Sequence, residues 1–93
     1  MRWTWDERKF RENLFKHGLD FVTAQFVFQD SLSLSRPDRY SGEERWQTIG
    51  MIGEVCVLVI HTWPEEDEDS GRIISARRAT RTERKDYEEG NFQ

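Results

Sequence analysis

The densest group of side chains that could do chemistry lies near the end of the chain, in the stretch RIISARRATRTERK at residues 72–85. This stretch holds five arginines and one lysine, and Glu83 is its one acidic residue. Guanidinium groups bind phosphate oxygens in a two-pronged fork and keep their charge at every working pH. The stretch is therefore typical of a surface that binds a phosphodiester backbone rather than of a small-molecule pocket.

The alternative is an ordinary solvated surface. Arg84 and Lys85 have acidic neighbours at positions 83, 86, 88 and 89, with which they could pair along a helix. The formal net charge of −4 does not decide between the two, since residues 65–69 contribute −5 and residues 70–85 contribute +5. Salt limits the reach of each block to about 8–10 Å, so an approaching anion responds to the local charge.

A proton-transfer group and a metal site are the other chemical possibilities. His61 stands at the end of an apolar segment and could be an acid or base, or a packed structural histidine. The segment DEDSG, which begins at Asp67, resembles the start of a calcium loop, but Arg78 stands where such a loop needs its closing glutamate. No pair of cysteine or histidine residues has ligand spacing, so we predict no metal and no cofactor.

The length of 93 residues allows one small domain, which we place at 1–93. Hydrophobic residues make up 35% of the chain, and four tryptophans and six phenylalanines supply enough apolar area for a folded core. The single cysteine, Cys56, excludes an internal disulfide and suits a reducing compartment. No apolar run has the length of a signal peptide or a membrane span, so we expect a soluble cytoplasmic protein without membrane contact.

Two helices are expected to come first. Asp6 can cap a helix over residues 7–17, and Gly18 is placed to end it. Asp20 can cap a second helix over residues 21–30, where apolar side chains recur every three or four positions. The aromatic and β-branched residues of this second segment leave a strand as the alternative.

A hairpin is the strongest local prediction. Two apolar segments flank Gly53 and Glu54, and glycine in the first of two turn positions indicates a type II′ turn. The resulting register places Trp46 opposite His61. The second strand, over residues 55–60, is apolar on both faces and should lie in the middle of the sheet.

Shorter segments complete an α+β fold. SLSLS at residues 31–35 predicts a strand, RIISARRA at 72–79 another, and Thr80 or Thr82 can cap a short C-terminal helix. We therefore expect two N-terminal helices, a curved antiparallel sheet of about four strands and a short C-terminal helix.

The two faces of the hairpin differ in bulk. One carries large apolar side chains, namely Ile49, Met51, Cys56, Leu58 and Ile60, and we expect the helices to cover it. The other is lighter and more polar, with Thr48, Gly50, Val57, Val59 and His61, and is the expected ligand side. Strict alternation along the last strand would put Ile74 and Ala76 in the core and aim Ser75 and Arg77 at this polar side, near His61.

Four segments in order carry a specific resemblance: WDERKFRENLFKHGLDF, RPDRYSGEERWQTIGMIG, HT and RIISARRATRTERKDYEEG. Over residues 5–90 the chain resembles the BrnT family of type II toxin-antitoxin toxins. The resemblance implies a RelE-like ribonuclease fold and RNA cleavage that stops growth by blocking translation. It also implies neutralisation by a BrnA-like antitoxin, through which alone the complex would contact operator DNA.

The resemblance also directs attention to particular residues. Metal-independent RNA cleavage needs a base, cations beside the phosphorus and a donor for the leaving oxygen. Arg77 of ISAR and Arg45 of EERW are the candidate cations, and His61 is the candidate acid or base. Tyr87 is an alternative proton donor, or else an anchor for the last helix. The candidate RNA-binding residues are Lys16, His17, Arg36, Arg78 and Arg81.

One conflict and two alternatives stay open. Alternation sends Arg45 to the face opposite His61, so the two can share a site only if Arg45 lies beyond the ladder or a bulge reverses the parity. The chain could instead be a non-catalytic module that binds nucleic acid or an acidic protein segment. It could also be an inactive toxin retained for operon regulation.

Overall fold

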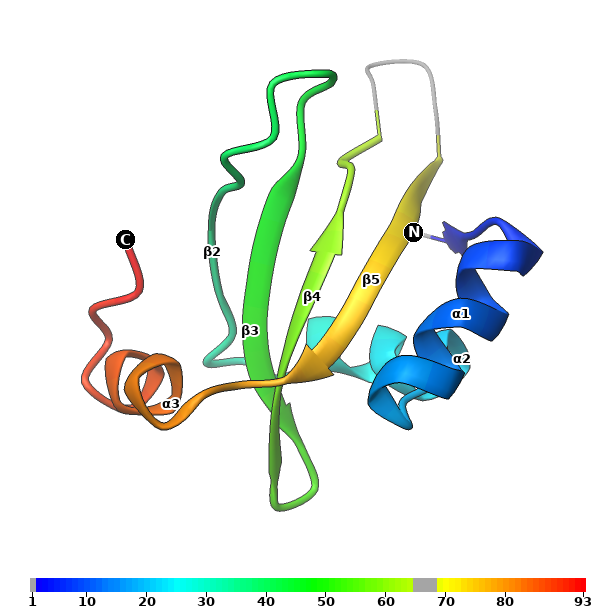
Figure 1. Cartoon of the computed structure of the whole chain (residues 1–93). Helices are drawn as coiled ribbons and strands as arrows, with labels where there is room; N and C mark the ends of the chain where they lie inside the picture. The colour runs from blue at the N-terminus through cyan, green and yellow to red at the C-terminus, as the bar shows by residue number, and fades with distance from the viewer. Residues whose placement is uncertain (1, 65–68) are drawn as a thin grey trace.

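A single mixed sheet carries the helices of this protein. The structure, a computed structural model, describes residues 2–64 and 69–93. Its elements are β1 (Arg2–Thr4), α1 (Glu7–His17), α2 (Phe21–Ala24), the 3-10 helix η1 (Gln25–Gln29), β2 (Leu34–Pro37), β3 (Trp46–Ile52), β4 (Val55–His61), β5 (Ser70–Arg78) and α3 (Arg81–Glu88). The strand order is β1-β5-β4-β3-β2. Figure 1 shows α1 and α2 together, and α3 away from them beside β2 and β3.

The expected α+β class is confirmed, with five strands among the described residues in place of about four. The additional strand, β1, pairs in parallel with the start of β5, whereas all other neighbours in the sheet are antiparallel. A three-residue strand is too short to show an alternating pattern, which is why the sequence does not predict it.

Both N-terminal helices form where their caps predict them. The Asp6 carboxylate accepts hydrogen bonds from the backbone N–H groups of Arg8 and Lys9, and Gly18 ends α1 with φ of 67°. Asp20 caps α2 through the N–H of Thr23. After one α-helical turn the backbone tightens into η1, so the second segment is helical and the strand alternative is wrong.

The hairpin of β3 and β4 has the predicted register, with Trp46 opposite His61 and Ile52 opposite Val55. Gly53 has φ of 60°, and no other residue type has positive φ in the described part of the chain, so the turn is type II′. β4 lies in the middle of the sheet, as its apolar character on both faces predicts.

The start of β2 differs slightly from the prediction, and the structure decides which threonine caps α3. β2 begins at Leu34 rather than at residue 31, because the Asp30 carboxylate and carbonyl accept the N–H groups of Leu32 and Ser33 in a turn. Thr80 rather than Thr82 caps α3, through a capping box with Glu83.

The expectation that all the helices cover the bulky face of the hairpin is wrong for α1 and α2. They pack on the lighter face, where Phe21, Ala24 and Val27 contact Val57 and Val59. The small side chains of this face permit a close approach of η1: a Cβ added to Gly50 would lie 2.9 Å from a methyl carbon of Val27. Both faces are therefore apolar enough to be buried, and the lighter one receives the larger helical layer.

The bulky face is covered by the C-terminal segment. Phe92 packs with Ile49, Cys56 and Leu58, and Tyr87 of α3 lies at the edge of this cluster. The Tyr87 hydroxyl donates a hydrogen bond to the Asp30 carboxylate, which also accepts from the N–H of Met51. Tyr87 thus anchors α3 to the rest of the fold.

A β-bulge changes the parity of β5. Ile60 pairs with Ser75, whereas His61 pairs with Ile73, so Ile74 is an extra residue in the ladder. As a result Ile73 turns to the same side as Ala76, and both pack against the N-terminal helices. Arg77 lies in the regular part of the ladder and pairs with Leu58, so it points away from the lighter face that the helices and Ala76 share. The prediction that Arg77 faces His61 is therefore wrong.

Candidate functional site

Arginines from three parts of the chain lie on the sheet face turned away from α1 and α2. Arg36 of β2 pairs with Gln47, and Arg77 of β5 pairs with Leu58, so both point to the same side as Ile60 and Leu58. Arg72 lies between Gly71 and Ile73, which turn toward the helix layer, so alternation puts Arg72 on this side as well. We call this surface, with Arg36, Arg45, Arg72 and Arg77, the arginine face.

Arg77 is held in a two-pronged ion pair. Its two terminal nitrogens donate to the two carboxylate oxygens of Glu83 at 2.7 and 2.9 Å, and one of them also donates to the carbonyl of Arg78. The hydrogen bond from Arg77 is the main cause that lowers the pKa of Glu83 to about 2. The Arg77 side chain remains 33% exposed, so solvent or a ligand can reach it.

Arg45 and Arg72 share one carboxylate. The Glu43 oxygen accepts from Arg45 at 3.1 Å and from Arg72 at 2.5 Å. The hydrogen bond from Arg45 is the main cause that lowers the pKa of Glu43. The Arg45 guanidinium also stacks 3.7 Å from the centre of the Tyr40 ring. These contacts hold two positive charges close together at one end of the sheet.

Arg36 is oriented by an amide and an aromatic ring. Its Nε donates to the Gln47 side chain at 2.8 Å, and its guanidinium lies 3.9 Å from the centre of the Phe92 ring. Gln47 in turn donates to the Asp38 carboxylate at 2.7 Å, which is the main cause of a lowered Asp38 pKa. These contacts hold the Arg36 guanidinium against Phe92 of the C-terminal segment.

His61 lies on the other side of the sheet. It is fully buried against the rings of Trp3, Phe28 and Trp63, and its Nε2 lies 2.6 Å from the Thr48 hydroxyl oxygen. Burial lowers the His61 pKa to about 4, so the ring is neutral at neutral pH. Arg77 pairs with Leu58 and therefore lies on the side of Arg45 and away from His61, so the three candidate catalytic residues do not form one site.

The other RNA-binding candidates lie around the edges. Lys16 and His17, in the last turn of α1, line a shallow groove beside Asn13 and Ser75. Arg78 is exposed and pairs with Val57, on the side opposite Arg77. Arg81 is exposed at the start of α3. Among the described residues, none of these four side chains pairs with a carboxylate that also holds an arginine of the arginine face.

Sequence reasoning does not single out two features of the structure. The first is the link between Arg72, which belongs to the basic stretch seen in the sequence, and Arg45, because the Glu43 carboxylate that joins them is 29 positions from Arg72 in the chain. The second is a pocket of about 410 Å³ between the sheet and η1, lined by Trp3, Gln25, Phe28, Gln29, Ser33, Ser35, Thr48 and Trp63. Its residues come from four separate segments, and only the high tryptophan content hints at it.

Metal ligands and membrane-spanning helices can be sought among the residues that the structure describes. These residues contain no cluster of three or more metal-ligating acidic, histidine or cysteine side chains. Asp67, where the calcium-like segment begins, lies outside them. None of their helices has the length and apolar character needed to cross a membrane.

The fold and this site define a small α+β protein that presents oriented guanidinium groups around the sheet face covered by its C-terminal segment, as suits the binding of a phosphate polyanion. A family model described as the ribonuclease toxin BrnT of type II toxin-antitoxin systems matches residues 5–83. The chain therefore belongs to this family of ribonuclease toxins, and the resemblance seen in the sequence is confirmed. No curated protein matches the chain.

Proposed function

We propose that this toxin cleaves RNA on the arginine face without a metal ion, by attack of a ribose 2′-hydroxyl on the adjacent phosphodiester. The observation that carries the proposal is the gathering of Arg36, Arg45, Arg72 and Arg77 on one sheet face of a chain in the ribonuclease-toxin family. Guanidinium groups stabilise the extra negative charge that the phosphorane carries in the transition state.

Arg77 is the proposed cation at the reacting phosphate. A guanidinium has five N–H donors, and Arg77 uses three of them on Glu83 and the Arg78 carbonyl. Two donors are thus left for phosphate oxygens without breaking the ion pair. Glu83 fixes the orientation of the guanidinium before the substrate arrives, which favours transition-state stabilisation.

The other arginines would hold neighbouring phosphates. The backbones of Arg36 and Arg77 are separated by three strand spacings, or about 14 Å, and each guanidinium is held by its own partners, so we assign the two arginines to different phosphates. Arg45 and Arg72, held together by Glu43, form a second cationic point at the end of the sheet. A strand of RNA that follows the edge of the arginine face, outside the covering C-terminal segment, would therefore meet positive charge at several phosphates.

The proton steps involve water in this proposal. The 2′-oxygen forms a bond to phosphorus and loses its proton to water, while the bond from phosphorus to the 5′-oxygen breaks and that oxygen takes a proton from water. The carboxylates beside the arginines, Asp38, Glu43 and Glu83, have lowered pKa values and are weak bases. We do not assign His61 a proton-transfer role, because it is buried on the opposite side of the sheet.

The products distinguish this proposal from simple binding. Purified protein incubated with single-stranded RNA should yield fragments with 5′-hydroxyl ends and 2′,3′-cyclic phosphates, in the presence of excess EDTA as well as in its absence. A non-catalytic binding module would shift intact RNA in a gel and produce no fragments. Loss of cleavage with EDTA, restored by a divalent cation, would contradict the metal-independent mechanism.

We also propose that cleavage stops growth by blocking translation and that a BrnA-like antitoxin neutralises the protein by covering the arginine face with Asp and Glu side chains. Complementary charge accounts for fast, salt-sensitive association. Expression of the toxin alone should arrest growth, and expression with its partner should not. If expression of the toxin alone is harmless, the result favours the alternative, an inactive toxin retained for operon regulation.

A further inference from the structure

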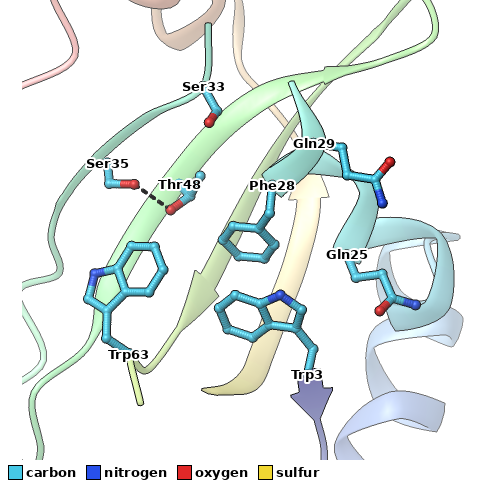
Figure 2. A pocket seen from close by; sticks show the side chains of 8 residues that line it. All are labelled: Trp3, Gln25, Phe28, Gln29, Ser33, Ser35, Thr48 and Trp63. Atoms are coloured by element: carbon cyan, nitrogen blue, oxygen red, sulfur yellow. Dashed lines mark hydrogen bonds between the residues drawn. The ribbon is translucent and has the colours of Figure 1, made fainter. Parts of the chain in front are cut away.

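The pocket that the mechanism leaves unused has aromatic walls. Trp3 of β1 and Phe28 of η1 stack with ring centres 4.0 Å apart and planes 12° apart. Trp63, which follows β4, has its ring centre 6.1 Å from each of them. Figure 2 shows these rings beside Ser33, Ser35 and Thr48, with the amides of Gln25 and Gln29 at one side. We call this the aromatic pocket.

The floor of the aromatic pocket is a directed chain of hydrogen bonds. The Nδ1 of His61 lies 3.1 Å from the carbonyl of Thr62, which can only accept, so Nδ1 carries the proton and Nε2 of the neutral ring accepts. The Thr48 hydroxyl must then donate to Nε2, at 2.6 Å, and accept from Ser35, at 2.7 Å. The Ser35 hydroxyl has therefore used its proton, and it can only accept further hydrogen bonds.

This arrangement suits one kind of ligand, a flat aromatic ring with N–H groups on its edge. The ring surfaces offer stacking, the Ser35 oxygen offers an acceptor, and the exposed amide of Gln29 offers both a donor and an acceptor. An unpaired nucleobase has this combination of a π-face and polar edge groups, and proteins bind unpaired bases in this way.

A second cleft links the aromatic pocket to the arginine face. It runs over the end of the sheet and is lined by Glu43, Glu44, Trp46, Thr62, Trp63, Pro64 and Arg72. Trp63 lines both the cleft and the aromatic pocket, Arg72 belongs to the arginine face, and Glu43 is its ion-pair partner. A strand whose phosphates contact Arg72 and Arg45 can therefore pass this end and place a base beside Trp63.

We infer that the aromatic pocket binds one unpaired nucleobase of the RNA substrate and so selects the position of the cut. This inference rests on the proposed function, because that function supplies the RNA. It assigns a positioning role to the buried Thr48 and His61, which fix the direction of the hydrogen bond that the exposed Ser35 offers to the base.

The test measures binding in the absence of cleavage. The probes are fluorescently labelled 2′-O-methyl oligonucleotides, which cannot react, each compared with copies that carry one abasic position. Wild-type protein should bind the complete probe at least tenfold more tightly than the copy abasic at the recognised position. Trp63→Leu, at a partly exposed position, and Ser35→Ala should lose this difference, whereas Phe15→Leu, which removes a 95% exposed ring from α1, should keep it.

The inference is overturned if the wild-type protein binds complete and abasic probes equally. It is also overturned if folded Trp63→Leu and Ser35→Ala both keep the preference of the wild type for the complete probe. Far-ultraviolet circular dichroism verifies folding, and Ser35→Ala changes only one hydroxyl, so it provides the result if Trp63→Leu unfolds. The proposed function is tested separately by cleavage of unmodified RNA. Discrimination against abasic probes without cleavage would contradict the nuclease and support the base pocket.

Discussion

His61 and Arg77 show how the surroundings of a residue decide its chemistry. The sequence identifies His61 as a group that titrates near neutrality, but it does not show that Trp3, Phe28 and Trp63 enclose it. It identifies Arg77 as a phosphate-binding type, but it does not show the ion pair with Glu83. Residue type was predictable in both cases, whereas burial and partners depend on contacts between distant segments.

The buried histidine should make folding stability depend on pH. Its pKa is about 4 in the folded protein, against an ordinary value of 6.5, so the unfolded chain binds a proton that the folded protein excludes. The His61 contribution is fully present above pH 6.5 and is lost as the pH falls toward 4, by up to about 3 kcal/mol. Urea unfolding measured across this range should show the fall.

The matched variant for this measurement is His61→Gln, which does not titrate. Its stability at pH 7 should be lower than that of the wild type, because a packed ring is lost, but its decline between pH 6.5 and pH 4 should be shallower. If both proteins lose the same stability over that range, the buried neutral histidine is not the cause.

At the scale of elements, local signals predict structure well and long-range packing does not follow from them. The glycine turn and the flanking apolar segments predict the register of β3 and β4, and Asp6, Asp20 and Thr80 mark the helix starts. The bulge at Ile74 has no glycine or proline to indicate it, yet it places Arg72 on the same face as Arg77. The covering of the lighter sheet face depends on the space at Gly50, which a hydrophobic pattern does not reveal.

The role of Gly50 can be measured directly. A methyl group at this position would lie 2.9 Å from the Val27 side chain and 3.2 Å from an oxygen of the Asp30 carboxylate, so the helix layer would have to move. Gly50→Ala should therefore destabilise the fold by about 1–3 kcal/mol, the usual cost of overpacking a core. Thermal unfolding followed by circular dichroism measures this loss, and unchanged stability would show that η1 does not need the glycine.

For the molecule as a whole, the positions of the charged side chains matter more for anion binding than the net charge does. The total is −4, yet the arginine face collects side chains from β2, from the residue before β3 and from both ends of β5. The family match ends at residue 83, within α3, whereas Phe92 and Gln93 beyond it contact Arg36. Ribonuclease-toxin membership thus rests on residues 5–83, and the C-terminal tail adds a contact to the proposed RNA surface.

The most direct test of the arginine-face mechanism compares the two partners of one ion pair. Single-turnover cleavage of a single-stranded RNA is measured for the wild type, Arg77→Ala and Glu83→Ala. Each substitution removes the pair at the start of α3, but only the first removes the cation. The mechanism predicts that Arg77→Ala slows cleavage by about 100-fold or more, while Glu83→Ala, which keeps the cation but loses its fixed orientation, slows it by about tenfold or less. Equal loss in both folded variants, or full activity in Arg77→Ala, would contradict it.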